Sequence, residues 1–223
     1  EDFSLDAEAF CGKDGLTVIT NPNAPTGMAL PLAVIEEIVS SSRGVVLVDE
    51  AYVDFGAESA VNLIDRYDNL LVVQTFSKSR SMAGARLGFA FANAALIADL
   101  ERIKYSTNPY NINRLTQTAG AQALEEDDYF RANCRRIIET RDYVSAELQK
   151  RGFTLTDSQA NFLFAKSDRI DGETLYRRLR EKGVLIRHFT KDRIKNYNRI
   201  TIGSREEMEI FLQKTDEILE ELV

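Results

Sequence analysis

The chain has 223 residues, of which 44% are hydrophobic and 28% are charged, and its formal net charge is −7. This composition is ordinary for a globular protein. The acidic balance argues against a nucleic-acid-binding protein, which would present a basic surface. No apolar run is long enough to span a membrane. The two cysteines, Cys11 and Cys134, are far apart, so we expect reduced thiols in a cytoplasmic protein.

The first half of the chain alternates between strand and helix patterns. Residues 15–20 are rich in β-formers and end in a Pro/Asn turn, and residues 30–42 then show apolar residues at helical spacing. Further apolar runs predict buried strands at 44–52, 70–78 and 86–92. This order favours a mostly parallel sheet covered by helices. Only the loop from residue 78 to 85 separates the last two strands, so they are predicted to be antiparallel or joined by an unusual loop.

The order of elements changes in the second half. Helices are predicted at 94–104, 111–125, 128–152, 172–183 and 205–223, and strands at 153–166, 184–189 and 198–204. The helix at 128–152 is long and charged, which suits a link between two domains. We therefore predict an α/β fold whose larger domain ends at residue 125. The linking helix and a small α+β domain then occupy residues 126–223.

Several enzyme classes lack their usual residues in this sequence. His188 is the only histidine and has no nucleophile motif beside it, which disfavours a Ser-His-Asp triad. One histidine and two distant cysteines also make a zinc site improbable. The glycine-rich motifs for dinucleotides and for P-loop phosphates are both missing.

Polar residues instead gather at the C-terminal ends of the predicted strands, where open α/β sheets bind their ligands. They are Asp49, Glu50 and Tyr52 after the second strand, Thr75, Ser77 and Lys78 after the third, and Arg86 before the fourth. Each alone has a structural explanation, such as a solvated lysine or a carboxylate that caps a helix. Their joint position indicates a functional site.

Six stretches of the chain, in order, resemble motifs of the fold-type-I pyridoxal-phosphate-dependent aminotransferases, and within them the histidinol-phosphate aminotransferase group. They are NPNAPTG (21–27), VVLVDEAYVDF (45–55), TFSKSRSMAGARLGFAFA (75–92), NPYNIN (108–113), SQANFLF (158–164) and NRITIGSREE (198–207). The resemblance implies that residues 1–125 are the remainder of a large cofactor-binding domain. It also implies pyridoxal 5′-phosphate as cofactor, an amino donor and a 2-oxo acid as substrates, and a homodimer at full length. Histidinol phosphate and 2-oxoglutarate, in histidine biosynthesis, are the favoured pair.

The resemblance assigns a cofactor role to three residues in particular. Lys78 would form the Schiff base with the cofactor aldehyde and then move the substrate's Cα proton. Asp49 would pair with the pyridine nitrogen, so that the ring can accept electrons. Tyr52 would donate a hydrogen bond to the phenolic oxygen of the ring.

The ends of the bound molecules are assigned to further groups. Arg86 would hold the cofactor phosphate through its planar guanidinium, helped by the hydroxyls of Thr75 and Ser77. In the second domain, the resemblance implies that the substrate is bound by Arg187, Arg199 and Asn161.

The sequence departs from the family pattern in two places. The position before P-T-G, where the family has an Asn that bonds the ring oxygen, is Ala24. We expect either Tyr52 alone to serve that oxygen or Asn23 to reach it. The sequence also lacks an initiating Met and the glycine-rich turn that grips the phosphate in the family. We therefore expect a piece of a longer protein, and weak cofactor retention by this piece alone.

Other functions remain open at this point. The same motifs would suit an aminotransferase for another amino acid or a pyridoxal-phosphate-dependent decarboxylase of phosphorylated substrates. VVLVDE also looks like a Walker-B strand, whose carboxylates hold magnesium in nucleotide hydrolases. An inactive binding fragment is a third alternative.

Overall fold

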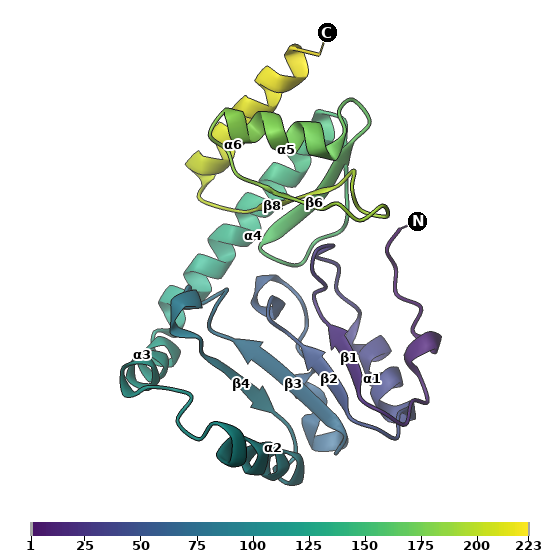
Figure 1. The fold of residues 1–223 in the computed structure, drawn as a ribbon, viewed down its shortest axis with the longest axis vertical. Coiled ribbons are helices and arrows are strands. Elements are labelled where there is room, and N and C mark those ends of the chain that lie inside the picture. Colours follow the sequence, from purple (N-terminus) through teal and green to yellow (C-terminus); the bar gives the residue numbers. More distant parts are fainter. Residues whose placement is uncertain (1, 223) are drawn as a thin grey trace. The chain divides into compact units, whose positions relative to one another are not determined.

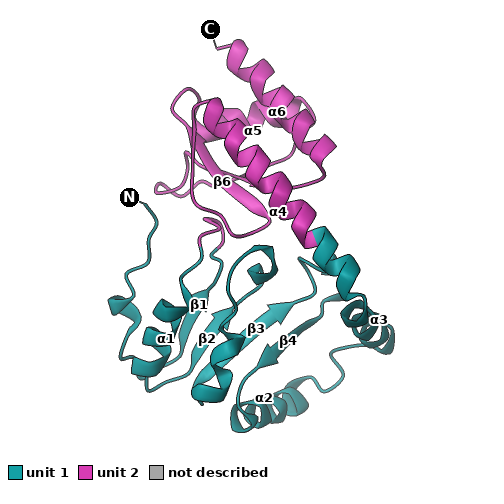
Figure 2. Cartoon of the chain, turned by 180° about the vertical axis from the view of Figure 1, so that it is seen from behind, with its two compact units in different colours: residues 1–23, 29–133 teal, residues 24–28, 134–223 magenta. Residues whose placement is uncertain are grey.

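The computed structural model describes residues 2–222. The chain divides into two compact units, shown in different colours in Figure 2. Residues 1–23 and 29–133 form the first unit, and residues 24–28 and 134–223 form the second unit. The chain therefore enters the second unit early, for five residues, before it returns to complete the first.

The first unit is built on a four-stranded sheet with the strand order β1-β2-β3-β4 (Figure 1). The strands are β1 (Thr17–Thr20), β2 (Val46–Asp49), β3 (Leu70–Thr75) and β4 (Gly88–Phe91). The first three strands are parallel, and β4 is antiparallel to β3. The predicted α/β class, the mostly parallel sheet and the antiparallel last pair are thus confirmed.

One helix of the first unit packs its apolar residues against the sheet, whereas the two helices that follow the last strand bury almost nothing. The helices of the first unit are α1 (Leu32–Ser41), α2 (Ala94–Thr107), α3 (Arg114–Glu125) and the start of α4 (Asp127–Lys150). Short 3-10 helices are η1 (Glu8–Phe10), η2 (Val53–Phe55), η3 (Ala60–Arg66) and η4 (Ala83–Ala85). In α1, Ile35, Ile38 and Val39 lie at helical spacing and are buried with the strand residues Val46 and Val48. Packing of α1 against the parallel strands in this core holds the C-terminal ends of these strands in place.

The expectation of a buried strand at 86–92 is wrong. No residue of β4 is buried, and Phe91 is 38% exposed. The reason is that β4 has only one neighbouring strand and that the helices after it bury almost nothing: α2 has no buried residue and α3 has only Gly120. The apolar run therefore predicts the strand correctly but not its burial.

The second unit contains a smaller antiparallel sheet with the order β5-β6-β8-β7. Its strands are β5 (Phe153–Leu155), β6 (Phe162–Ser167), β7 (Arg187–His188) and β8 (Asn198–Thr201), and its further helices are α5 (Gly172–Glu181) and α6 (Arg205–Glu220). Buried residues of α4, α5 and α6 form one core with the central strands; among them are Leu148, Leu179, Leu212, Leu163 and Ile200. The predicted small α+β part is confirmed.

The prediction of one continuous strand at 153–166 is wrong. The structure has the antiparallel pair β5 and β6 with a loop of six residues between them. Ser158 closes this loop, because its hydroxyl donates to the carbonyl of Phe162 at 2.5 Å and accepts from the amide of Ala160 at 3.2 Å. Such local side-chain bonds compete with a strand ladder.

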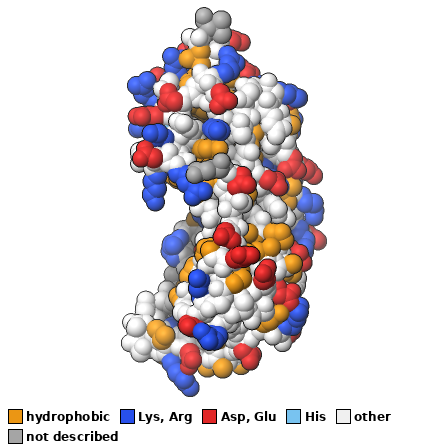
Figure 3. Space-filling model, turned by 90° about the vertical axis from the view of Figure 1, so that its right-hand side faces the viewer, with side chains coloured by type: hydrophobic (Ala, Val, Ile, Leu, Met, Phe, Trp, Pro, Cys, Tyr) orange, Lys and Arg blue, Asp and Glu red, His pale blue; other side chains and the backbone are white. Residues whose placement is uncertain are grey.

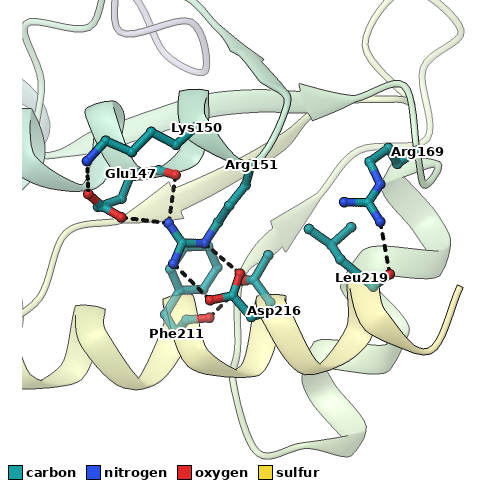
Figure 4. A network of polar contacts seen from close by, with 8 residues as sticks. Glu147, Lys150, Arg151, Arg169, Phe211, Asp216 and Leu219 are labelled. Carbon is teal, nitrogen blue, oxygen red and sulfur yellow. Dashed lines mark hydrogen bonds and ion pairs between the residues drawn. The ribbon is translucent and has the colours of Figure 1, made fainter. Parts of the chain in front are cut away.

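A polar network joins the end of α4 to α6 within the second unit (Figure 4). The guanidinium of Arg151 donates to both carboxylate oxygens of Asp216, at 2.7 and 2.8 Å, and to Glu147 at 2.8 Å. These hydrogen bonds, to Asp216 first and then to Glu147, raise the pKa of Arg151. Lys150 contacts the other oxygen of Glu147 at 2.5 Å. The two parallel hydrogen bonds between the guanidinium of Arg151 and the carboxylate of Asp216 fix the relative orientation of the two side chains.

Charged side chains of both signs are interspersed over the face drawn in Figure 3. On this face, blue and red groups alternate with apolar ones and do not form a single basic surface. Among residues 2–222, no helix is both long and apolar enough to cross a membrane.

Candidate active site

The three parallel strands of the first unit have their C-terminal ends on the same side of the sheet (Figure 1). The last residues of these strands, Thr20, Asp49 and Thr75, are polar. Thr20 of β1 pairs with Asp49 of β2, and Asp49 pairs with Val73 of β3. The ladder continues just beyond the strands, because Asn21 donates its amide to the carbonyl of Asp49 at 2.8 Å. This alignment puts the ends of β1 and β2 level with Val73, two residues before the end of β3.

Asp49 and Tyr52 are held by the turn that follows β2. The carboxylate of Asp49 is partly buried and accepts the amide of Ala51 at 3.0 Å. Tyr52 comes directly before η2. Its ring centroid lies 5.3 Å from Nζ of Lys78, which is within the range of a cation–π contact. The structure therefore brings the predicted pair Tyr52 and Lys78 together.

Lys78 lies in the loop between β3 and β4, and its side chain is exposed. The loop begins at Thr75, whose hydroxyl accepts the amide of Ser77 at 3.0 Å and donates to the carbonyl of Leu87 at 3.3 Å. Through these two hydrogen bonds, Thr75 contacts both the start and the end of the loop. Thr75 and Ser77 are consequently fixed a short way before the lysine.

Arg86 returns to the same edge of the sheet, because β4 runs back along β3 and Thr75 pairs with Gly88. Its backbone is left-handed, with φ 55°, and its guanidinium donates to the carbonyl of Ala83 at 3.1 Å. The side chain is exposed. Arg86, Lys78 and Asp49 thus lie on the same side of the sheet, where the parallel strands have their C-terminal ends.

Asn23 and Ala24 follow β1 in the Pro/Asn turn. The amide Nδ2 of Asn23 donates to the hydroxyl of Thr20 at 2.8 Å, so this side chain lies at the end of β1. Ala24 has no hydrogen-bonding side chain and is the first residue of the five that belong to the second unit.

The three remaining predicted residues lie in the second unit. Arg187 of β7 pairs directly with Arg199 of β8 in the antiparallel register. Cζ of Arg199 lies 5.0 Å from the ring centroid of Phe162. Its Nε is buried and has no hydrogen-bond partner among residues 2–222. The carbonyl of Asn161 accepts the amide of Ile202 at 2.9 Å, which places Asn161 just before β6 and beyond the end of β8.

The second unit therefore presents two neighbouring cations, one of them with an unused buried donor. Like charges directly opposite one another on a sheet are unfavourable. A bound anion would relieve this repulsion and would satisfy Nε of Arg199. The predicted residues accordingly fall into two sets, a lysine–carboxylate set in the first unit and an arginine pair in the second.

Several residues around the candidate site were not assigned a role from the sequence. Glu50 is almost fully buried and accepts hydrogen bonds from Ser59, from the amide of Ala60 and from Gln74, at 2.7, 2.6 and 2.8 Å. Burial raises the pKa of Glu50. Its partners are 9 to 24 residues away in the chain, so no local motif could have revealed them.

Ser79 and Arg80, directly after the lysine, were also missed. The hydroxyl of Ser79 donates to Asp54 at 2.5 Å, and the guanidinium of Arg80 donates to the carbonyl of Ala123 at 2.5 Å. The available signal was a serine and a charged residue immediately beside the candidate lysine.

Comparison with known proteins identifies similar chains along the whole sequence. Residues 1–214 match the family described as "Aminotransferase class I and II". A histidinol-phosphate aminotransferase of Clostridium botulinum is 49% identical over 223 residues, which are 100% of this chain and 63% of that protein. One of Brachyspira hyodysenteriae is 48% identical over 98% of this chain and 62% of that protein. The chain thus spans less than two thirds of the length of these relatives.

The fold has counterparts among solved structures. The histidinol-phosphate aminotransferase of Clostridium acetobutylicum superposes with a TM-score of 0.87 at 26% identity, over 99% of this chain and 70% of that one. This similarity covers both units of the chain. It agrees with the fold class predicted from the order of strands and helices.

Proposed function

Because the chain belongs to the aminotransferase class I and II family, we propose that it forms part of a pyridoxal-phosphate-dependent aminotransferase. The observation that carries this proposal is the exposed amine of Lys78 against the ring of Tyr52, at the sheet edge where Asp49 ends β2. Pyridoxal phosphate, predicted from the sequence, is the cofactor of this family. The Walker-B alternative loses its support, since the whole VVLVDE stretch lies within the family match.

The residues at the sheet edge fit that cofactor chemically. The group needs an amine for its aldehyde, an acid for its ring nitrogen, a donor for its phenolic oxygen and cations or hydroxyls for its phosphate. Lys78, Asp49 and Tyr52 supply the first three, with Asn23 as a second donor for the phenolic oxygen. The phosphate partners are Arg86, Thr75 and Ser77. When bound, the cofactor supplies an electron sink for the carbanion formed at the substrate's Cα.

The residues of the chain have distinct tasks in this proposal. Asp49 holds a proton at the ring nitrogen, and its place at the end of an apolar strand strengthens that pairing. Lys78 would accept and move the proton that leaves the substrate's Cα, for which an exposed amine is suited. Tyr52 packs against that amine and limits the directions it can take.

The arginine pair of the second unit points to an anionic substrate. Arg187 and Arg199 lie opposite each other on neighbouring strands, and Nε of Arg199 lacks a partner among the described residues. Guanidinium groups bind phosphate and carboxylate oxygens in a bidentate manner. Histidinol phosphate as amino donor, with Asn161 beside it and 2-oxoglutarate as acceptor, is therefore the substrate pair that we propose. We also propose that the full-length protein is a cytoplasmic homodimer.

The proposal is tested on the full-length protein by adding pyridoxal phosphate and recording the visible spectrum. We expect an absorbance band that borohydride abolishes and that histidinol phosphate alters more strongly than an unphosphorylated amine. Replacement of Arg187 by Gln should raise KM for histidinol phosphate by about tenfold, or ~1.4 kcal/mol. It should change KM for the unphosphorylated amine little.

The matched control is Arg180→Gln, because Arg180 is exposed on α5 and carries the same charge. It should leave both KM values unchanged. A protein that gives no visible band, or that prefers the unphosphorylated donor, would refute the corresponding part of the proposal.

A further inference from the structure

The loop that carries Lys78 has an unusual backbone. Ser81 and Arg86 both adopt left-handed conformations, with φ 57° and 55°, although neither is glycine. Residues other than glycine rarely adopt this conformation, and it persists only where the surroundings hold it in place. Ser79 and Arg80, the two residues after Lys78, make contacts that hold the loop in this conformation.

Ser79 fastens one side of the loop to η2. Its side chain is buried, and its hydroxyl donates to Oδ2 of Asp54 at 2.5 Å. The preceding residue, Lys78, contacts the ring of Tyr52. Two adjacent loop residues therefore meet two residues of one short segment, Tyr52 and Asp54. This double contact restricts both the backbone and the side chain of Lys78.

Arg80 fastens the other side of the loop to the helices. Its guanidinium donates to the carbonyl of Ala123, in the last turn of α3, where carbonyls lack partners within the helix. Cζ of the same group lies 3.9 Å from the ring centroid of Phe130 in α4. A planar guanidinium can stack and donate at the same time, which an ammonium group does less well. Arg80 makes no ion pair within residues 2–222, so its role here is to anchor rather than to neutralise a carboxylate.

We propose that Ser79 and Arg80 are positioning residues that hold the amine of Lys78 at the edge of the sheet. The inference rests on the proposed function in one respect, namely that Lys78 is the lysine that bonds the cofactor. The two residues touch neither cofactor nor substrate in this account. They act by fixing the loop between η2 on one side and α3 and α4 on the other.

The first test needs no cofactor and uses amide hydrogen exchange of the 223-residue chain. The amides of Ser81 and Met82 report on the loop, because they donate to the carbonyls of Lys78 and Phe76. Ser79→Ala and Arg80→Ala should each speed exchange there by about tenfold. Exchange in β2 should stay as it is, since the core of the sheet is not changed.

Variants of Asp54 separate a positioning role from general destabilisation. Asp54→Asn keeps an oxygen that accepts from Ser79 and should exchange like the parent protein, whereas Asp54→Ala should resemble Ser79→Ala. Arg102→Ala removes an exposed arginine of α2 and serves as the control for Arg80→Ala. Unchanged exchange at Ser81 in all loop variants, or an equal rise in β2, would overturn the inference.

The second test links the loop to the lysine itself. In full-length protein treated with pyridoxal phosphate and borohydride, Arg80→Ala should lower labelling of Lys78 by about tenfold relative to Lys13. Faster exchange with undiminished labelling would contradict the positioning role. Absence of labelling at Lys78 in the parent protein would instead refute the proposed function, while the exchange measurement still decides whether these residues hold the loop.

Discussion

At the scale of single residues, Glu50 is the buried charge that the first unit must accommodate. A carboxylate removed from water is costly unless donors surround it. Here the hydroxyl of Ser59, the amide of Ala60 and the side chain of Gln74 supply three donors. Burial is the largest influence, and it raises the pKa of Glu50 above its ordinary value of 4.5 in spite of these hydrogen bonds. Glu50 thus joins the end of β2 to η3 and to β3.

This shift predicts a pH dependence of stability. A carboxyl group with a raised pKa in the folded state binds its proton more tightly when folded than when unfolded. Stability is therefore greatest below pH 4.5 as far as this group is concerned, and it falls as the pH rises from 4.5 through the folded pKa. Glu50→Gln should remove that decline in urea unfolding experiments at several pH values. Glu101→Gln, on the exposed face of α2, should keep it, and an unaltered decline in Glu50→Gln would exclude this explanation.

The residues that the chemistry requires can be predicted from the sequence, whereas the contacts that hold them in place cannot. Lys78, Asp49 and Tyr52 were identified because they follow predicted strands, and strand ends are where ligands bind. Glu50, Ser79 and Arg80 depend on partners brought near by the fold, so their contacts could not be read from spacing.

At the scale of elements, the short segment 24–28 is the clearest feature that local patterns did not predict. It belongs to the second unit, where the carbonyl of Thr26 accepts the hydroxyl of Thr156 at 2.5 Å. The carbonyl of Gly27 accepts the amide of Gln159 at 2.8 Å. The Pro/Asn turn was predicted, whereas its attachment to the loop between β5 and β6 arises from contacts about 130 residues apart.

Gly27 is predicted to be indispensable in this segment. Its φ is +75°, and a Cβ at this position would overlap the side chain of Ser158. Gly27→Ala should therefore destabilise the second unit by more than the roughly 1–2 kcal/mol that a left-handed alanine costs. Gly183→Ala isolates that cost, because its φ is +83° and no atom lies near its added Cβ. Equal loss of unfolding free energy in the two variants would show that the overlap is relieved without cost.

Helix and strand signals in the sequence were reliable where local chemistry decides the structure. Ser204 is the N-cap of α6 and forms a capping box with Glu207, and the apolar stripe of this helix is visible in the sequence. The strand pattern at 153–166 was misleading, because it hid the polar residues that form the loop after β5. The burial of β4 could not be predicted from its own residues, because burial depends on the elements that cover a strand, and α2 and α3 bury almost nothing.

At the scale of the whole molecule, each unit has its own core, and the second unit adds a polar link on its surface. Arg151 binds both oxygens of Asp216 while it also contacts Glu147 (Figure 4). The guanidinium is 20% exposed. A largely buried bidentate pair of this kind holds the end of α4 against α6.

Arg151→Ala should therefore weaken the second unit by about 1 kcal/mol, measured by hydrogen exchange of the amides of α6. Arg151→Lys should recover part of this loss, because an ammonium group keeps the charge but not the fork. Lys195→Ala removes an exposed ion pair with Asp192 and should change almost nothing. Equal effects of Arg151→Ala and Lys195→Ala would show that the network adds no more than an ordinary surface pair.

The general architecture could be predicted because it follows from the order of elements. Strand, helix and strand near the start require a parallel crossover, and a short loop between the last strands requires an antiparallel pair. The α+β character of the second part followed from its interspersed short strands and helices. The early passage of the chain through the second unit left no mark in composition or periodicity.

The most direct measurement of the central claim is to identify which lysine bonds the cofactor. Full-length protein is incubated with pyridoxal phosphate, reduced with borohydride and digested, and the modified peptides are located by mass spectrometry. We predict that the peptide containing Lys78 carries the added group about tenfold more often than those containing Lys13 or Lys104. The modification should disappear from that peptide in Lys78→Arg. Equal modification of all exposed lysines, or preference for a lysine away from the sheet edge, would contradict the account.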